Sequence, residues 1–98
     1  MGNVRIKVDV FGGTAPVPIF IFIDKVNSND DTRIKRNGSF DESFTIAGGE
    51  YNVIVSGENA IGGSTNVEVE YTDNNGITKT KRYSMTNPIY SKIFKVFI

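Results

Sequence analysis

Five oxygen-bearing side chains lie close together after an apolar segment of the chain. They are Asp24, Asn27, Asn29, Asp30 and Asp31. Calcium binds about six to eight hard oxygen ligands, and loops of this composition can supply them. The spacing matches no EF-hand, however, and no glutamate follows as a closing bidentate ligand. We therefore weigh a calcium site against a polar loop whose Asn and Asp side chains cap the turn. The polar loop, with no resident cofactor, is the preferred interpretation.

Nucleophilic catalysis through histidine or cysteine is excluded by the composition. The chain contains no histidine and no cysteine, so Ser-His-Asp and Cys-His arrangements and the usual zinc ligands are absent. Paired carboxylates for glycoside hydrolysis remain. The candidates are Asp9, Asp41 with Glu42, and Glu68 with Glu70. All fall on outward strand positions or turns, where carboxylates are usually solvated, so no enzymatic activity is expected.

Exposed aromatic rings are a common means of binding carbohydrate. The alternation of the sequence leaves Phe11, Tyr83 and Tyr90 without a clear place in a core. We take Tyr83 and Tyr90 as candidate ligand-binding residues, with packing in the core or at strand ends as the preferred alternative. Spacing alone does not assemble these rings into one platform.

Two basic clusters could contact phosphate or an acidic sugar. They are Arg33, Lys35 and Arg36, and Lys79, Lys81 and Arg82. Basic residues on an edge strand also deter edge-to-edge association, and that is the preferred interpretation. Eleven basic residues balance eleven acidic ones, and neither cluster is interleaved with aromatics. Nucleic-acid binding is therefore not expected.

The elements that must position these side chains are strands. Polar and apolar residues alternate along most of the chain, and no window carries a helical stripe. The expected strands span residues 4–10, 17–24, 32–36, 40–46, 51–55, 67–71, 77–84 and 89–98. Short strands at regular spacing predict a single all-β domain over residues 1–98. Its expected fold is an antiparallel β-sandwich of about seven to eight strands, immunoglobulin-like or prealbumin-like.

The segment Asp73-Asn74-Asn75-Gly76 predicts a hairpin turn, because these residues tolerate positive φ. In either plausible register, Glu68 and Glu70 lie across from Lys79 or Lys81. Exposed cross-strand pairs of this kind contribute about 0.2–1 kcal/mol each. They help to fix the register and do not form a binding patch.

Two segments carry apolar side chains on both faces. Residues 17–24, VPIFIFID, are expected to form a central strand covered on both sides. In the last segment, IYSKIFKVFI, Ile93 and Phe97 lie on the face opposite to Val96. An apolar strand of low charge needs cover to avoid aggregation. It either lies centrally beside residues 17–24, which is preferred, or uses Ile93 and Phe97 as an interface with another chain.

Residues 12–60 contain a recognisable order of features. A glycine-rich start and a proline-containing lead precede an apolar strand, Asn37-Gly38 predicts a hairpin, and a Gly-x-Tyr strand follows. The residues that carry the pattern are Thr32, Asn37, Gly38, Ser39, Phe40, Ile46, Gly49, Tyr51, Val53 and Val55. This segment, about half of the chain, resembles the carboxypeptidase regulatory-like domains within the wider transthyretin-like sandwiches. The resemblance implies a sandwich fold and an accessory role without a catalytic centre.

Together these patterns predict a non-catalytic accessory or binding module that takes a protein or a carbohydrate ligand. The alternative is a structural, self-assembling subunit, and the chain is expected to be a monomer or a homodimer. The longest apolar run, residues 16–23, has about half the length of a membrane-spanning helix, and the N-terminus shows no signal peptide. Abundant Asn, Ser, Thr and Gly favour a bacterial extracellular, cell-surface or periplasmic location, with the cytoplasm as the alternative.

Overall fold

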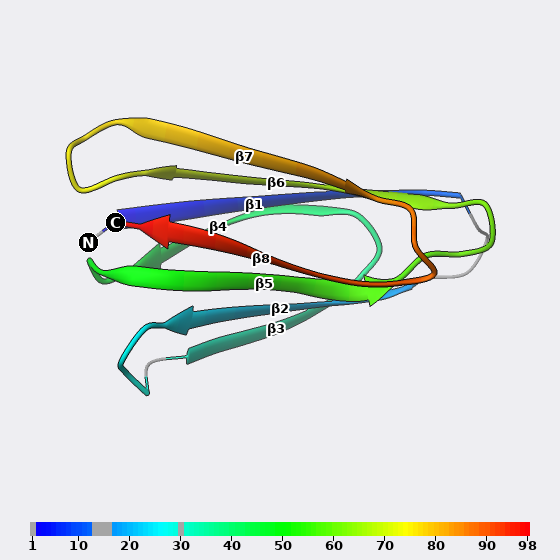
Figure 1. Cartoon of the computed structure of the whole chain (residues 1–98), viewed down its shortest axis with the longest axis horizontal. Coiled ribbons are helices and arrows are strands. Elements are labelled where there is room, and N and C mark those ends of the chain that lie inside the picture. The colour runs from blue at the N-terminus through cyan, green and yellow to red at the C-terminus, as the bar shows by residue number, and fades with distance from the viewer. Residues whose placement is uncertain (1, 13–16, 30) are drawn as a thin grey trace.

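The computed structural model describes residues 2–12, 17–29 and 31–98. Its strands are β1 (Gly2–Phe11), β2 (Pro18–Lys25), β3 (Asp31–Asn37), β4 (Phe40–Ile46), β5 (Glu50–Glu58), β6 (Ser64–Thr72), β7 (Thr78–Met85) and β8 (Ile89–Phe97). They form two antiparallel four-stranded sheets, one above the other (Figure 1). Sheet A has the order β4-β1-β6-β7, and sheet B has the order β3-β2-β5-β8. The expected all-β sandwich is confirmed.

The core lies between the two sheets and follows the period of two that a strand imposes on its side chains. In β1 the inward residues Val4, Ile6 and Val8 are fully buried, and the residues between them point to solvent. Tyr51 and Val53 in β5 are buried in the same way. Most core residues are Val or Ile, whose branched side chains fit a pleated surface. Fully burying each one contributes about 1.5–3 kcal/mol.

The turn at Asn37-Gly38 joins the two sheets and does not form the expected hairpin. β3 pairs with β2, whereas β4 pairs with β1. Gly38 adopts a φ of 99°, which favours glycine. By crossing here, the chain supplies one edge strand to each sheet, so Ile34 and Phe40 both pack against the shared core from opposite layers. A turn-forming dipeptide sets the local backbone but does not decide which strands pair.

The expected register of the β6–β7 hairpin, with glutamates opposite lysines, is wrong by one residue. Glu68 lies opposite Arg82, and Glu70 lies opposite Thr80. The N–H of Gly76 donates to the carbonyl of Asp73 at 3.0 Å, and the N–H of Asp73 donates to the carbonyl of Ile77 at 2.8 Å. With Gly76 at a φ of 80°, this is a type I turn followed by a left-handed glycine. Such a three-residue loop shifts the pairing by one residue relative to a two-residue turn.

The strand β2 is central in its sheet, but it is covered on only one face. Ile19, Ile21 and Ile23 are buried against sheet A, while Phe20 on the other face keeps 50% of its surface exposed. The expectation that residues 17–24 are covered on both sides is therefore wrong. A sandwich has two layers, so each sheet keeps one face towards solvent unless another molecule covers it.

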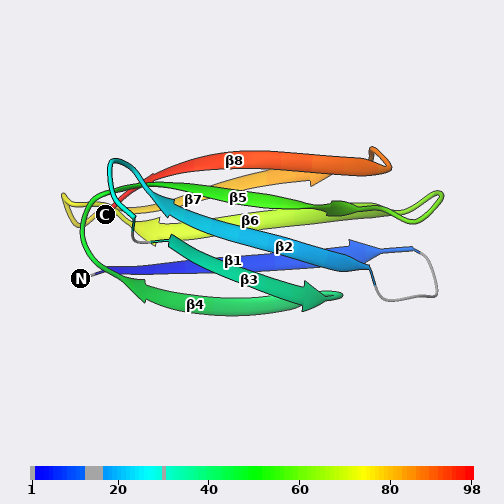
Figure 2. The same cartoon turned by 90° about the horizontal axis from the view of Figure 1, so that it is seen from below.

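The strand β8 lies at the edge of sheet B, and β5 separates it from β2 (Figure 2). The preferred expectation, a central β8 beside residues 17–24, is therefore wrong. β5 pairs with β2 along one side and with β8 along the other. Phe94 and Val96 of β8 are buried in the core, but Ile93 is 54% exposed and Phe97 is 50% exposed on the outer face.

Candidate interaction surface

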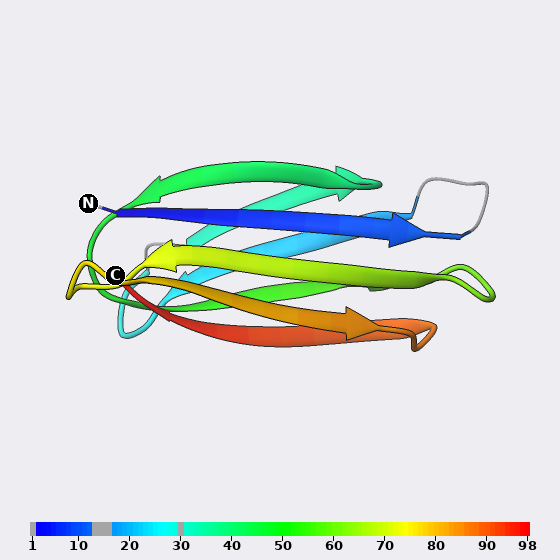
Figure 3. The ribbon, with the colours of Figure 1, turned by 90° about the horizontal axis from the view of Figure 1, so that it is seen from above.

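The two outer faces of the sandwich differ in chemistry. Figure 3 shows the strands of sheet A, β4, β1, β6 and β7, side by side from above. The outward residues of this sheet are Asp41, Ser43, Thr45, Asn3, Arg5, Lys7, Asp9, Asn66, Glu68, Glu70, Thr72, Thr78, Thr80, Arg82 and Ser84, with Phe11 at the end of β1. Sheet B instead exposes Phe20, Ile89, Ile93 and Phe97. A contiguous apolar patch on one face of a small domain is a mark of an interaction site.

The register of sheet B aligns one row of neighbouring side chains across all four strands. Arg33 in β3 lies beside Phe22 in β2, Phe22 lies beside Ile54 in β5, and Ile54 lies beside Ile93 in β8. We call Phe22, Ile54 and Ile93 the apolar row. Directly opposite residues in neighbouring strands have Cβ atoms about 4.5–5.5 Å apart, so the three side chains form one continuous surface.

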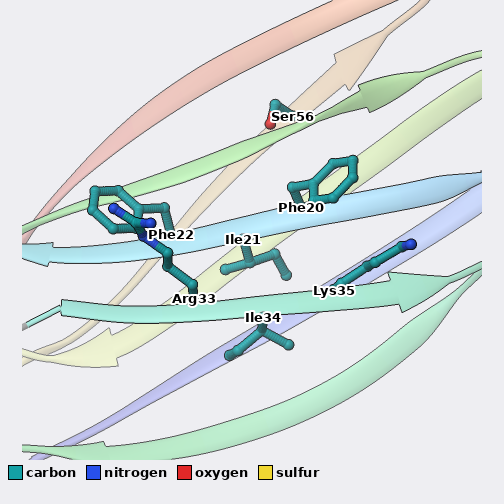
Figure 4. A pocket seen from close by; sticks show the side chains of 7 residues that line it. All are labelled: Phe20, Ile21, Phe22, Arg33, Ile34, Lys35 and Ser56. Atoms are coloured by element: carbon teal, nitrogen blue, oxygen red, sulfur yellow. The ribbon is translucent and has the colours of Figure 1, made fainter.

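A shallow groove of about 390 Å³ lies over β2 and β3, beside the apolar row (Figure 4). It is lined by Phe20, Ile21, Phe22, Arg33, Ile34, Lys35 and Ser56. The guanidinium carbon of Arg33 lies 5.0 Å from the centroid of the Phe22 ring, and Lys35 Nζ lies 5.8 Å from that of Phe20. Such contacts contribute about 0.5–1 kcal/mol at exposed sites. The groove therefore combines aromatic walls with a basic rim.

The calcium candidates are brought together only in part. Asp24 and Asp31 lie opposite each other in β2 and β3, and a hydrogen bond to Asp24 raises the pKa of Asp31 above its usual value. Asn27 adopts a φ of 59° in the exposed turn that also contains Asn29. Asp30 lies outside the described residues. Within residues 2–12, 17–29 and 31–98, no group of three or more acidic side chains is placed to hold a metal ion.

The two candidate tyrosines lie in different sheets and share no platform. Tyr90 in β8 is only 6% exposed, so its candidate role in ligand stacking is wrong and the preferred alternative, packing in the core, applies to it. Its hydroxyl lies close to Gly57, where an added Cβ would be 2.7 Å from it, and burial raises its pKa. Tyr83 in β7 is 47% exposed, and Lys92 Nζ lies 4.3 Å from its ring centroid. Tyr90 is buried because β8 turns its even-numbered residues inward.

Ile93 and Phe97, the candidate interface residues, both lie exposed on the outer face of sheet B. Sequence reasoning missed their partners in this face, Phe22 and Ile54, because residues 17–24 were expected to be covered on both sides. A signal was present in β2, where isoleucines at odd positions alternate with Phe20 and Phe22 at even ones. Because isoleucines line one face of β2 and phenylalanines line the other, the pattern indicates that the two faces of this strand lie in different environments.

Several of the candidate catalytic carboxylates are held in ion pairs with arginines. Asp41 pairs with Arg5, Glu42 with Arg36, and Glu68 with Arg82. Hydrogen bonds from these guanidinium groups hold the pKa of Asp41 and of Glu42 below their usual values. Acids with lowered pKa values stay ionised at neutral pH, which suits structural ion pairs and not a general acid.

Charged side chains protect the edges of the sandwich. On one side, Arg36 of β3 and Glu42 of β4 form an ion pair between the two sheets. On the other side, the ammonium group of Lys81 in β7 donates to the main-chain carbonyl of Lys95 in β8. Lysines and inward-pointing charges at an edge resist the addition of a further strand. The outer face of sheet B is therefore better suited to binding than the edges are.

Comparison of the chain with protein-family models, with curated proteins and with solved structures finds no match. The resemblance of residues 12–60 to the carboxypeptidase regulatory-like domains therefore stays a prediction. In the part of the chain that the structure describes, no helix is long and apolar enough to cross a membrane.

Proposed function

We propose that this chain is a non-catalytic interaction module that binds a protein partner through the outer face of sheet B. The observation that carries the proposal is the contrast between the polar outer face of sheet A and the apolar row of sheet B. Covering apolar surface stabilises a complex by about 25 cal/mol per Å² before the costs of association. A partner that covers Phe20, Ile93 and Phe97 would remove large apolar side chains from water.

The composition of the face favours a protein over a carbohydrate. The centres of protein interfaces are enriched in aromatic residues and arginine, as in the contact between Phe22 and Arg33. Small-ligand sites need several convergent polar groups to fix orientation, whereas Ser56 is the only uncharged polar side chain among the described residues that line the groove. Carbohydrate is the alternative ligand class.

The accessory role, the transthyretin-like relationship and the extracellular or periplasmic location belong to the same proposal. The composition supports the location, and the residues of the segment 12–60 support the transthyretin-like relationship. The engagement of Glu42 and Asp41 in ion pairs supports an accessory role without catalysis. A structural subunit that assembles through the same face is the second candidate. The exposure of Ile93 and Phe97 there favours it.

The test is a displayed peptide library and a glycan array, each probed with the wild-type protein, with Phe22→Ser and with Thr80→Ala. Thr80 is the matched control on the outer face of sheet A. We expect peptide ligands whose affinity falls about thirtyfold in Phe22→Ser, as for an interface hot spot, and is unchanged in Thr80→Ala. Ligands found only among glycans would overturn the ligand class. Ligands lost in Thr80→Ala but kept in Phe22→Ser would show that the ligand does not bind the outer face of sheet B.

A further inference from the structure

We propose that the partner is a second copy of this chain, which packs face to face on sheet B about a two-fold axis. The axis runs parallel to the strands, between β2 and β5. This inference rests on the proposed function, because it names the occupant of the same surface. A two-fold interface must be self-complementary, so each residue of the face has to suit the residue that the axis places opposite it.

The charges of Asp31 and Lys95 meet this requirement. One row of sheet B runs from Asp31 in β3 through Asp24 and Asn52 to Lys95 in β8. A two-fold axis between β2 and β5 exchanges β3 with β8 of the second copy and keeps each row in place. Asp31 of each copy then lies opposite Lys95 of the other, which gives two pairs of opposite charge at the rim.

The apolar row meets the requirement too. The same axis places Phe22 of one copy opposite Ile54 of the other, twice, at the centre of the interface. Arg33, stacked on Phe22, comes opposite Ile93. An apolar centre with an aromatic anchor and a charged rim is the usual anatomy of a protein interface. A two-fold axis perpendicular to the strands through this row would instead place Arg33 against itself, and like charges disfavour that arrangement.

The mixed charge of the face argues against other large partners. Its outward cations are Arg33, Lys35 and Lys95, and its outward anions are Asp24, Asp31, Glu50 and Glu58. A nucleic acid or an anionic membrane requires a surface of one sign. Charges of both signs on this face can pair with the same charges on a second copy, because the two-fold axis reverses the order of the strands in the copy that lies opposite.

The proposed interface would use most of the outer face of sheet B. The Cα atoms extend over 41 × 26 × 18 Å. Figure 1 is viewed down the shortest of these axes and shows the two sheets stacked along the intermediate one, so the outer face of sheet B lies across the longest and the shortest. A stable interface buries about 800 Å² on each partner. That is a modest part of the total accessible surface of 5837 Å², but it requires most of the outer face of sheet B.

Sedimentation equilibrium of the whole chain over about a hundredfold range of concentration tests the inference. We expect a monomer–dimer equilibrium for the wild type. Ile93→Arg places a second cation opposite Arg33 of the other copy, and the dissociation constant is expected to rise at least about a hundredfold. Ile93 is half exposed in the monomer, so the variant should still fold, which circular dichroism checks. Ile61→Arg is the matched control, because Ile61 is fully exposed in the turn between β5 and β6.

Charge reversal tests the position of the axis. Lys95→Asp and Asp31→Lys should each weaken the dimer about tenfold, and the double variant should restore it. A double variant weaker than both single variants would overturn the proposed axis. A dimer insensitive to Ile93→Arg would show that the outer face of sheet B is not the interface.

A wild type that stays monomeric throughout would overturn the second copy as partner. The proposed function would stand in that case if peptide ligands are still lost in Phe22→Ser. It would fail separately if neither a dimer nor a peptide ligand depends on this face.

Discussion

Arg36 and Glu42 form a bidentate ion pair that joins the edge strands of two different sheets. Arg36 Nε donates to Glu42 Oε2 at 2.6 Å, and Nη2 donates to Oε1 at 2.8 Å. Both residues occupy inward positions, on the same sides of β3 and β4 as Ile34 and Phe40. The pair therefore closes one side of the sandwich at the point where the chain crosses between the sheets.

Glu42→Gln is expected to lower the melting temperature at pH 7, because it removes the charge that pairs with Arg36. Hydrogen bonding to Arg36 holds the pKa of Glu42 below its ordinary value of 4.5. The stabilisation is thus present above pH 4.5 and is lost as the pH falls through the lower pKa of the folded state. Thermal unfolding of both proteins at neutral and acidic pH measures this difference.

The matched control is Arg82→Gln, which breaks the pair with Glu68. The Arg82 side chain is 75% exposed, and exposed pairs contribute little to stability. This change should have a smaller effect than Glu42→Gln. If the effect of Glu42→Gln is the same at all pH values, the ion pair is not its cause.

Gly57→Ala is expected to destabilise the fold by about 1–3 kcal/mol, as overpacking does. The new Cβ would lie 2.7 Å from the hydroxyl oxygen of Tyr90 and 3.0 Å from the carbonyl oxygen of Pro18. Chemical denaturation measures the change in the free energy of unfolding. In a Tyr90→Phe background the same change should cost less, because the nearest atom is gone and only the contacts with the ring Cζ atom of residue 90 and with the Pro18 carbonyl, both at 3.0 Å, remain.

Tyr90→Phe by itself is expected to leave the free energy of unfolding unchanged or to raise it by up to about 1 kcal/mol. The hydroxyl is buried, and no described residue makes a hydrogen bond of good geometry with it, although an interaction with the Thr65 side chain partly offsets the effect of burial on its pKa. Removing an unpaired buried hydroxyl removes a desolvation cost. A loss of stability larger than about 1 kcal/mol would show that the hydroxyl is bonded in solution.

Asp73→Ala is expected to loosen the β6–β7 hairpin. Asp73 Oδ1 accepts from the backbone N–H groups of Asn75 and Ile77, both at 2.9 Å. The bond from Ile77 is the main reason that the pKa of Asp73 lies below its usual 3.8. Amide hydrogen exchange at Ile77 should be faster in the variant. Asp73→Asn keeps an acceptor oxygen and should exchange more slowly than Asp73→Ala.

The same carboxylate gives a pH dependence with a defined sign. Its stabilising contribution is present above pH 3.8 and is lost as the pH falls through the lower value of the folded state. A carboxyl titration followed by NMR should give a midpoint for Asp73 below 3.8. A midpoint at or above that value would contradict the turn described for this hairpin.

The Asp24–Asp31 pair is expected to stabilise the fold with a pH dependence opposite to that of Asp73, and Asp24→Asn tests this. Asp31 has a raised pKa because it shares a hydrogen bond with Asp24 and is repelled by its charge. The pair therefore stabilises the fold below pH 3.8, and this contribution is lost as the pH rises through the raised value. Asp24→Asn should raise the melting temperature at pH 7 and give no gain in strong acid. A gain that persists in strong acid would rule out this carboxylate pair as its source.

Calcium addition and removal distinguish the two interpretations of the Asp24–Asp31 loop. For a polar loop, millimolar calcium and a chelator leave the melting temperature of the wild type unchanged. A calcium site would instead raise it with calcium concentration, by mass action on the folded state, and Asp24→Asn would abolish the rise. The second result would reinstate the oxygen-rich loop as a binding site.

Local chemistry determined the strands of this protein and the sides of each that face the core. Alternation in β1 and β5 places Val4 and Val53 inward, because a strand has only two faces and water disfavours apolar side chains. Turn residues at Asn37-Gly38 and Asp73–Gly76 likewise mark where the chain reverses. The sandwich class follows from many short strands that each bury one face.

Only the tertiary structure decided which strands became neighbours. Asn37-Gly38 reverses the chain in either a hairpin or a crossing between sheets, and the shared burial of Ile34 and Phe40 selects the crossing. The one-residue shift of β6 against β7 depends on the loop conformation at Gly76. The row of Phe22, Ile54 and Ile93 arises in the same way, because three strands distant in sequence must first pair in register. Pairing between distant segments is a property of the whole sheet, and no local pattern of side chains contains it.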